Sequence, residues 1–246
     1  MKKILLLITL LTATVAVQAQ TVDEILTKYF AQVGGKDKLA AQQSMKASGK
    51  LKVQGMELPL TVMAKAPNKT IAKVNFQGKE MIFNAFDGTT AWATNQMTLK
   101  PEAQSSEDSE NAKDEQQIQD PFIDYAAKGY KAELVGKETI EGTECHKIKL
   151  TRKPVKVEGK DEENTTEYFF SVADNVPIMT RSFMKKGPMK GKAIESYMSD
   201  YQDVNGLMVP FTMAQKMNGQ QVMSFTFEKI ENNVPVEDTV FVFPVK

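Results

Sequence analysis

The stretch SMKASGKLKVQG, residues 44–55, decides the fold. Small or apolar side chains alternate there with polar ones, at Met45, Ala47, Gly49, Leu51 and Val53. A period of two is typical of a β-strand with one buried face and one wet face. The Gln-Gly pair that follows is a turn signal. The stretch therefore predicts a long strand that ends in a hairpin.

The same alternation continues along most of the chain. It runs to about residue 95, stops at a polar and acidic segment (101–119), and resumes from 131 to 230. Turn signals such as Asp87-Gly88, Asn205-Gly206 and Asn218-Gly219 separate the runs. We count about eleven strands in a mainly β fold. Short antiparallel connections of this kind predict one strongly curved antiparallel sheet, an open half-barrel, with the few helices over its concave face.

Three segments interrupt the strands. Residues 21–33 carry apolar side chains at helical spacing behind a Thr that can cap a helix, and 36–43 predicts a weaker helix. The acidic segment 101–119 predicts a mobile loop running into a helix. Residues 121–127 predict a short amphipathic helix that begins with Pro121 and is closed by Gly129.

The N-terminus has the pattern of a secretory signal peptide. Lys2 and Lys3 precede an apolar run, and small residues stand at the cleavage positions before Gln20. The run, about fourteen residues, is short for a membrane span. We expect a leader at 1–19, a single domain at 20–246 and a periplasmic location. No later stretch predicts a membrane span, and the only Cys is not placed for lipid attachment.

The sequence lacks the usual signs of catalysis. Its only Cys and only His are neighbours, Cys145 and His146, on one predicted strand. Adjacent strand residues point to opposite faces, so we expect a buried Cys and an exposed His rather than a catalytic pair. No cluster has metal-ligand spacing, and no glycine-rich phosphate loop is present. A formal net charge of zero argues against nucleic acid. We expect a protein that is not an enzyme and that binds no metal and no cofactor.

Apolar residues occupy both faces of several strands. Met81 and Phe83 alternate with Ile82 and Phe86, and the chain holds 14 Met, a side chain that adapts to variable apolar partners. One sheet packed on one side needs a single apolar face. The second face indicates either further cover by helices or a ligand cavity, and the pattern alone does not separate the two.

A family resemblance rests on the turns of the chain. Pro67-Asn68-Lys69 leads into a strand, and Asp87-Gly88 begins an Asp-Gly-x-x-x-Trp segment that ends at Trp92. A helix precedes the long first strand. A Gly34-Gly35-Lys36 segment and the phrase DVNGLMVP, residues 203–210, complete the pattern. Over nearly all of the mature chain, the sequence resembles the LolA/LolB-type outer-membrane lipoprotein-sorting proteins.

The resemblance implies a non-catalytic periplasmic carrier that shelters the acyl chains of lipoproteins, or another apolar ligand, in a cavity. The dedicated carriers have an Arg shortly after the Pro-Gly-Lys turn that helps to hold a helical lid. Here Ile71 or a neighbour takes that place, and no Arg precedes Arg152. The implied alternative is an envelope sensor or interaction module that detects lipoproteins and binds a protein partner, with the acidic segment as a contact.

The predicted ligand site lies in the first half of the sheet. Strands joined by short turns are usually neighbours, and the segment 121–127 could cover them as a lid. We expect the ligand to contact Leu60, Val74, Phe76, Phe83 and Trp92, with Phe122 and Tyr125 above them. We expect a monomer whose partners are acyl chains or lipoprotein cargo.

Overall fold

The computed structural model describes residues 20–244, and the predicted signal peptide lies outside that range. The first half contains α1 (Val22–Gln32), α2 (Lys36–Ala40), β1 (Ser44–Val53), β2 (Met56–Lys65), β3 (Lys69–Phe76), β4 (Lys79–Phe86), β5 (Ala91–Thr94), β6 (Pro101–Ala103) and α3 (Ser106–Glu115). The second half contains β7 (Lys131–Ile140), β8 (Thr143–Val157), β9 (Lys160–Ser171), β10 (Pro177–Phe183), β11 (Ala193–Val204), β12 (Leu207–Met217), β13 (Gln220–Asn232) and the short helix η1 (Asp238–Val240).

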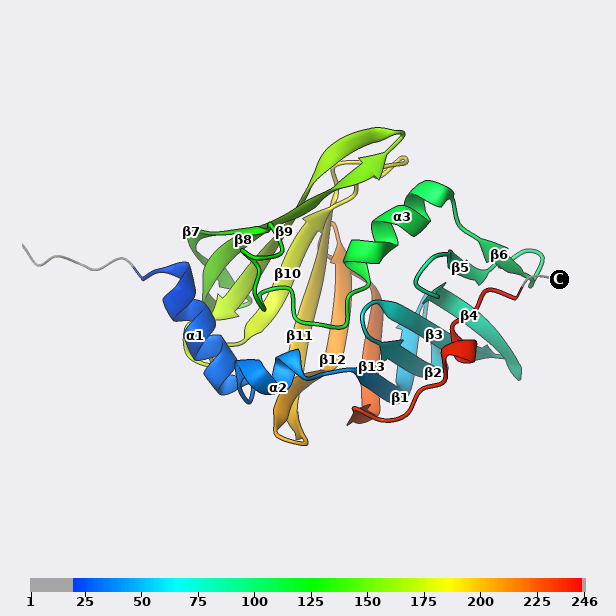
Figure 1. Cartoon of the computed structure of the whole chain (residues 1–246), viewed down its shortest axis with the longest axis horizontal. Coiled ribbons are helices and arrows are strands. Elements are labelled where there is room, and N and C mark those ends of the chain that lie inside the picture. Colours follow the sequence, from blue (N-terminus) through cyan, green and yellow to red (C-terminus); the bar gives the residue numbers. More distant parts are fainter. Residues whose placement is uncertain (1–19, 245–246) are drawn as a thin grey trace, which may run out of the picture.

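All the described strands form one antiparallel sheet in the order β6-β5-β4-β3-β2-β1-β13-β12-β11-β10-β9-β8-β7. The two end strands, β6 and β7, do not pair with each other, so the sheet is an open, curved half-barrel (Figure 1). This confirms the predicted fold class. The strands number thirteen rather than about eleven. One that the alternation does not reveal is β6, whose three residues are all exposed.

Two-residue turns set the register of the sheet. Six hairpins turn on an X-Gly pair in which both residues have positive φ: Gln54-Gly55, Gln77-Gly78, Glu141-Gly142, Glu158-Gly159, Asn205-Gly206 and Asn218-Gly219. Such turns match the right-handed twist of the flanking strands. Because the turns fix which residues pair, they also fix which side chains share a face.

The backbones of β1 and β13 approach each other closely at Gly49. The β1–β13 register shifts between Ser48 and Gly49, and a Cβ at Gly49 would lie 2.1 Å from the carbonyl oxygen of Thr226. Only glycine allows that approach, so the alternating position that the sequence reserves for Gly49 is a site of curvature.

The helices α1 and α3 lie on the concave face. Ile25, Leu26 and Tyr29 of α1 pack with Ile148 and Phe170 of the sheet. Ala112 of α3 packs with Phe86 and Ala91, and α3 also contacts β8, so α3 lies between the two ends of the sheet (Figure 1). The acidic segment is therefore largely a packed helix. Its N-terminus is capped by Ser105, whose Oγ accepts a hydrogen bond from the Asp108 N–H at 3.0 Å.

The predicted helix at 121–127 is wrong. Residues 121–129 form turns. The Asp120 carboxylate accepts the Phe122 N–H at 2.8 Å, and Asp124 has a φ of 49°. Side-chain capping of its own backbone and a left-handed residue both compete with a continuing helix.

Candidate functional site

An apolar cavity opens on the concave face beside β1–β4. Its volume is about 440 Å³, within the roughly 300–1,000 Å³ typical of small-molecule sites. We call it the β1–β4 cavity. Its lining is mainly apolar and includes two of the Met residues: Leu51, Val53, Met56, Leu58, Val74, Phe76, Met81, Ile82, Phe83, Ala93 and Leu99, with Gln54, Thr94 and Gln96.

Strand register explains why this lining is continuous. Leu51 pairs with Leu58 across β1 and β2, and Val74 pairs with Met81 across β3 and β4. Residues in register across neighbouring strands point to the same face. The period of two therefore places apolar residues from all four strands on the concave side.

Three of the predicted ligand residues line this cavity: Val74, Phe76 and Phe83. Phe83 is 38% exposed, so its ring is accessible to a ligand. Leu60 is 2% exposed and belongs to the same packed cluster as Leu51 and Val74, where it supports the lining. The structure thus brings four of the seven predicted residues together.

Trp92 packs elsewhere. It clusters with Ile71, Ala85, Val236 and Phe241, and its indole Nε1–H donates to the Phe241 carbonyl oxygen at 2.9 Å. The C-terminal segment, 233–244, therefore covers the second apolar face of β3–β5. The sequence left open whether the second apolar face is covered by other parts of the chain or lines a cavity. On the face that carries Trp92 the C-terminal segment is the cover, and the cavity lies on the concave face.

Phe122 and Tyr125 lie with α1. Phe122 is 3% exposed and packs edge-on against Tyr168 and Phe170, at centroid distances of 4.8 and 5.6 Å. The Tyr125 hydroxyl donates to Asp23 at 3.2 Å. Both residues belong to the α1 cluster, whereas Leu60 and Val74 belong to another. The structure does not group the two rings with the other predicted residues.

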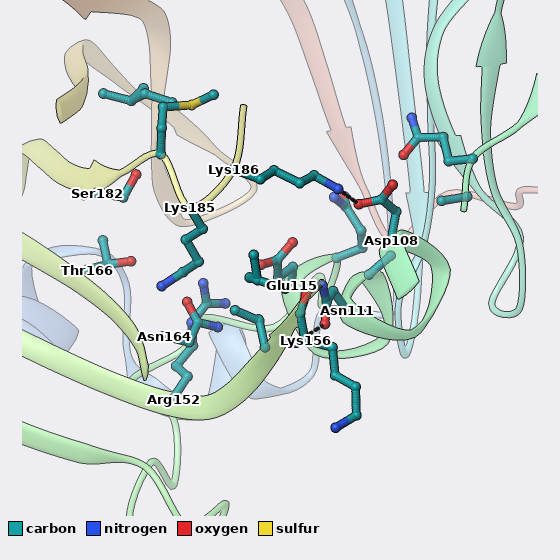
Figure 2. A pocket seen from close by; sticks show the side chains of 18 of the residues that line it. Asp108, Asn111, Glu115, Arg152, Lys156, Asn164, Thr166, Ser182, Lys185 and Lys186 are labelled. Carbon is teal, nitrogen blue, oxygen red and sulfur yellow. Dashed lines mark hydrogen bonds and ion pairs between the residues drawn. The ribbon is translucent and has the colours of Figure 1, made fainter. Parts of the chain in front are cut away.

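A second cavity was not predicted from the sequence. It lies beside α3, has a volume of about 490 Å³ and is lined by residues from β4, β5, β8, β9, β10 and β11 (Figure 2). We call it the α3 cavity. Its lining mixes apolar side chains with Arg152, Lys156, Lys185, Lys186, Asp108 and Glu115. The sequence signal for it was the Glu158-Gly159 turn, which folds β9 back on β8 and sets Asn164 beside Arg152.

Several polar contacts hold α3 against the sheet. Asn111 exchanges two hydrogen bonds with the backbone of Lys156, both at 2.8 Å, and Glu107 accepts the N–H groups of Glu158 and Gly159. Lys186 pairs with Asp108. Ile71, which the sequence comparison above placed at or next to the position of the carriers' Arg, is 1% exposed and packs under the C-terminal segment. In this chain the helix is therefore held by contacts other than that Arg.

Two of the segments that carry the family resemblance meet in space. A Cβ at Gly34 would lie 2.0 Å from the Gly206 carbonyl oxygen, and the Met208 N–H donates to the Val33 carbonyl at 3.1 Å. Gly34 therefore lets that corner of the chain touch the β11–β12 turn. The Asn68 side chain in turn donates to the Lys113 carbonyl of α3 at 2.9 Å.

Cys145 and His146 do not form a pair. Cys145 is 0% exposed and packs with Phe169 and Met179, and burial raises the pKa of its thiol. The prediction of an exposed His is wrong, because His146 is 7% exposed, and burial lowers the pKa of its imidazole. Burial favours the neutral form of both groups. Within residues 20–244, no three His, Cys, Asp or Glu side chains gather as metal ligands.

Comparison with known proteins identifies the fold. No family model matches the chain, and no curated protein matches its sequence. A DUF1329 family protein from Desulfovibrio piger is similar in structure, with a TM-score of 0.56, 12% identity, and cover of 91% of this chain and 98% of its own. A LolA superfamily protein from Nitrosomonas europaea is similar with a TM-score of 0.55 and 12% identity. The match covers 91% of this chain and 98% of that protein. An outer-membrane lipoprotein-sorting protein domain from Vibrio parahaemolyticus is similar with a TM-score of 0.56 and 11% identity. The match covers 89% of this chain and 94% of that domain.

These likenesses establish the class to which the fold belongs. The chain has the LolA-like fold, an open antiparallel half-barrel with helices over its concave face. In the described part of the chain, no helix combines the length and apolar character needed to cross a membrane.

Proposed function

We propose that this protein is a periplasmic, non-catalytic carrier that binds an acyl chain, of a lipoprotein or of another lipid, in the β1–β4 cavity. The observation that carries the proposal is the mainly apolar lining of an accessible cavity on the concave face of a LolA-like sheet. Burial of apolar surface contributes about 25 cal/mol per Å², so even part of one chain would be held. The packed positions of Leu51 in the lining and of Leu60 beneath it favour a cavity that exists before the ligand arrives.

The sensor alternative has less support. It uses the acidic segment as a contact for a protein partner, yet three of its carboxylates bind within the chain. Glu107 accepts backbone N–H groups of the β8–β9 turn, Asp108 pairs with Lys186, and Asp114 accepts the Tyr130 hydroxyl at 2.7 Å. These bonds occupy the charges that a partner would otherwise meet.

Bound lipid is the direct test of the carrier proposal. Protein purified from the periplasm without detergent should release acyl-containing molecules on extraction with organic solvent, at a near-stoichiometric ratio by mass spectrometry. The Phe83→Glu variant, prepared in parallel, serves as the control for lipid that adheres to the surface. Equal lipid in both preparations, or none in either together with failure to bind added acyl ligands, would contradict the proposal.

Export is tested separately. Because Lys2, Lys3 and the apolar run have the signal-peptide pattern, we expect cleavage between Ala19 and Gln20 when the full chain is expressed in a bacterium with two membranes. Intact-mass measurement of the periplasmic fraction should give a protein without its first nineteen residues. A full-length mass in the periplasmic fraction would overturn the assignment of the leader.

A further inference from the structure

The lining of the α3 cavity combines apolar and cationic side chains. The apolar ones are Phe86, Ala91, Ala112, Val155, Val157 and Ile194. Arg152, Asn164, Thr166 and Lys185 also line it, and Figure 2 shows Arg152 and Asn164 close together beneath Lys185. A cavity lined by both kinds of side chain matches a molecule that is itself amphiphilic.

Arg152 and Asn164 are a register pair. They face each other across β8 and β9, so their side chains point to the same side of the sheet. Asn164 is 4% exposed and its Nδ2 has no hydrogen-bond partner, and the buried Nε of Arg152 has none either. Arg152 forms no ion pair with any residue between 20 and 244. Buried donors without partners are costly, which indicates that an acceptor from outside the chain belongs there.

The neighbouring charges leave this pair available. Lys186 is paired with Asp108, Lys156 pairs with Asp161 at 2.6 Å, and Lys185 donates to the Glu163 carbonyl. Glu115 of α3 is the remaining carboxylate in the lining. Desolvation raises the pKa of its carboxyl and the charge of Arg152 opposes that shift, yet the two side chains form no ion pair. The lining therefore holds four cations against two carboxylates, with Arg152 not neutralised by direct contact.

The donor set specifies the chemistry of the missing acceptor. A guanidinium has only N–H donors, and the free group of Asn164 is also a donor. An acceptor-only group such as a carboxylate or a phosphate satisfies both, and charge-assisted hydrogen bonds of this kind are the stronger class. A neutral hydroxyl would leave the charge of Arg152 uncompensated.

We propose that the α3 cavity binds an anionic amphiphile, with its carboxylate or phosphate headgroup on Arg152 and Asn164 and its chain along Phe86, Val155 and Ile194. The inference rests on the proposed function in that the ligand is a lipid, and it adds the charge of the headgroup and a second cavity to that function. Selectivity for a charged headgroup is a property that the apolar β1–β4 cavity cannot supply.

Calorimetric titration of the purified, delipidated protein with three ligands of equal chain length tests this. Sodium laurate carries a carboxylate and dodecyl phosphate carries a phosphate, the two proposed headgroups. 1-Dodecanol carries only a neutral hydroxyl. We expect Arg152→Met to lower the affinity for laurate or for dodecyl phosphate about tenfold or more. The affinity for dodecanol should change less than about twofold. Lys52→Met, which removes the same charge from an exposed position on β1, should change none of the three.

The variants also separate a folding defect from a lost contact. Arg152→Met should melt no lower than the wild type, since it removes a charged group whose buried Nε has no hydrogen-bond partner. If it does fail to fold, Asn164→Leu applies the same test from the other strand. The larger loss among the two anions identifies the headgroup.

Two results would overturn the inference in different ways. Equal affinity for laurate, dodecyl phosphate and dodecanol, unchanged in the Arg152 and Asn164 variants, would overturn the headgroup site and leave the carrier function standing. Binding of none of the three would overturn both proposals.

Discussion

Replacing Phe83 by Glu should abolish binding of a neutral apolar probe and leave the protein folded. Phe83 lines the β1–β4 cavity and is 38% exposed, so a carboxylate there reaches water in the free protein. In the complex it would be desolvated beside an apolar ligand, and an unpaired charge in such surroundings costs several kcal/mol. Since each 1.4 kcal/mol is tenfold in affinity, titration with N-phenyl-1-naphthylamine should show a loss of about a hundredfold or more.

Val222→Glu is the matched control for this variant. Val222, on β13, is also 38% exposed and lines neither cavity, so the same carboxylate at that position should leave probe binding intact. Thermal melts of both variants should stay close to that of the wild type. Normal probe binding by Phe83→Glu, or its unfolding while Val222→Glu stays folded, would show that the β1–β4 cavity is not the ligand site.

The architecture was predictable because its signals are local. Alternation in 44–53 sets one face of β1, and Gln54-Gly55 folds β2 back in register with it. Each further hairpin repeats that step, so a long series of short antiparallel connections leads to a single curved sheet. The segments behind the family resemblance were informative for the same reason. Gly34 lies against Gly206, and a side chain at Gly34 would prevent that contact. The presence of glycine there therefore indicates the contact between the end of α1 and the β11–β12 turn.

The site was only partly predictable because alternation does not say which face is concave. Val74, Phe76 and Phe83 could be assigned from the sequence, since they lie on strands joined by short turns. Trp92 could not, because the segment that covers it, 233–244, lies far away in the sequence and has no strand pattern. The α3 cavity was missed for a related reason. The charged run 158–164 resembles a hairpin tip, whereas β9 begins at Lys160 and carries Asn164 inward.

Trp92→Ala should destabilise the protein by about 3–5 kcal/mol, the usual cost of truncating a buried Trp. The side chain is 4% exposed, its ring lies 5.8 Å from that of Phe243, and its N–H is bonded to the Phe241 carbonyl. Loss of the ring would remove the contact that fixes the C-terminal segment to β3–β5. Denaturant unfolding would measure the change, and protease digestion should then remove residues after about 233 first.

Trp92→Phe separates this structural role from the ligand contact that the sequence predicted. It keeps an aromatic ring in the cluster and loses the bond to Phe241, which should cost about 1 kcal/mol. If Trp92 only holds the C-terminal segment, this variant binds the neutral probe as the wild type does, because the β1–β4 cavity is lined by Ala93 and Thr94 of β5 and not by Trp92. If instead Trp92 contacts the ligand, Trp92→Phe would lower the affinity for the probe several-fold at nearly unchanged stability. That result would place the ligand on the face of the sheet that the C-terminal segment now covers, and the segment would have to move for the ligand to enter.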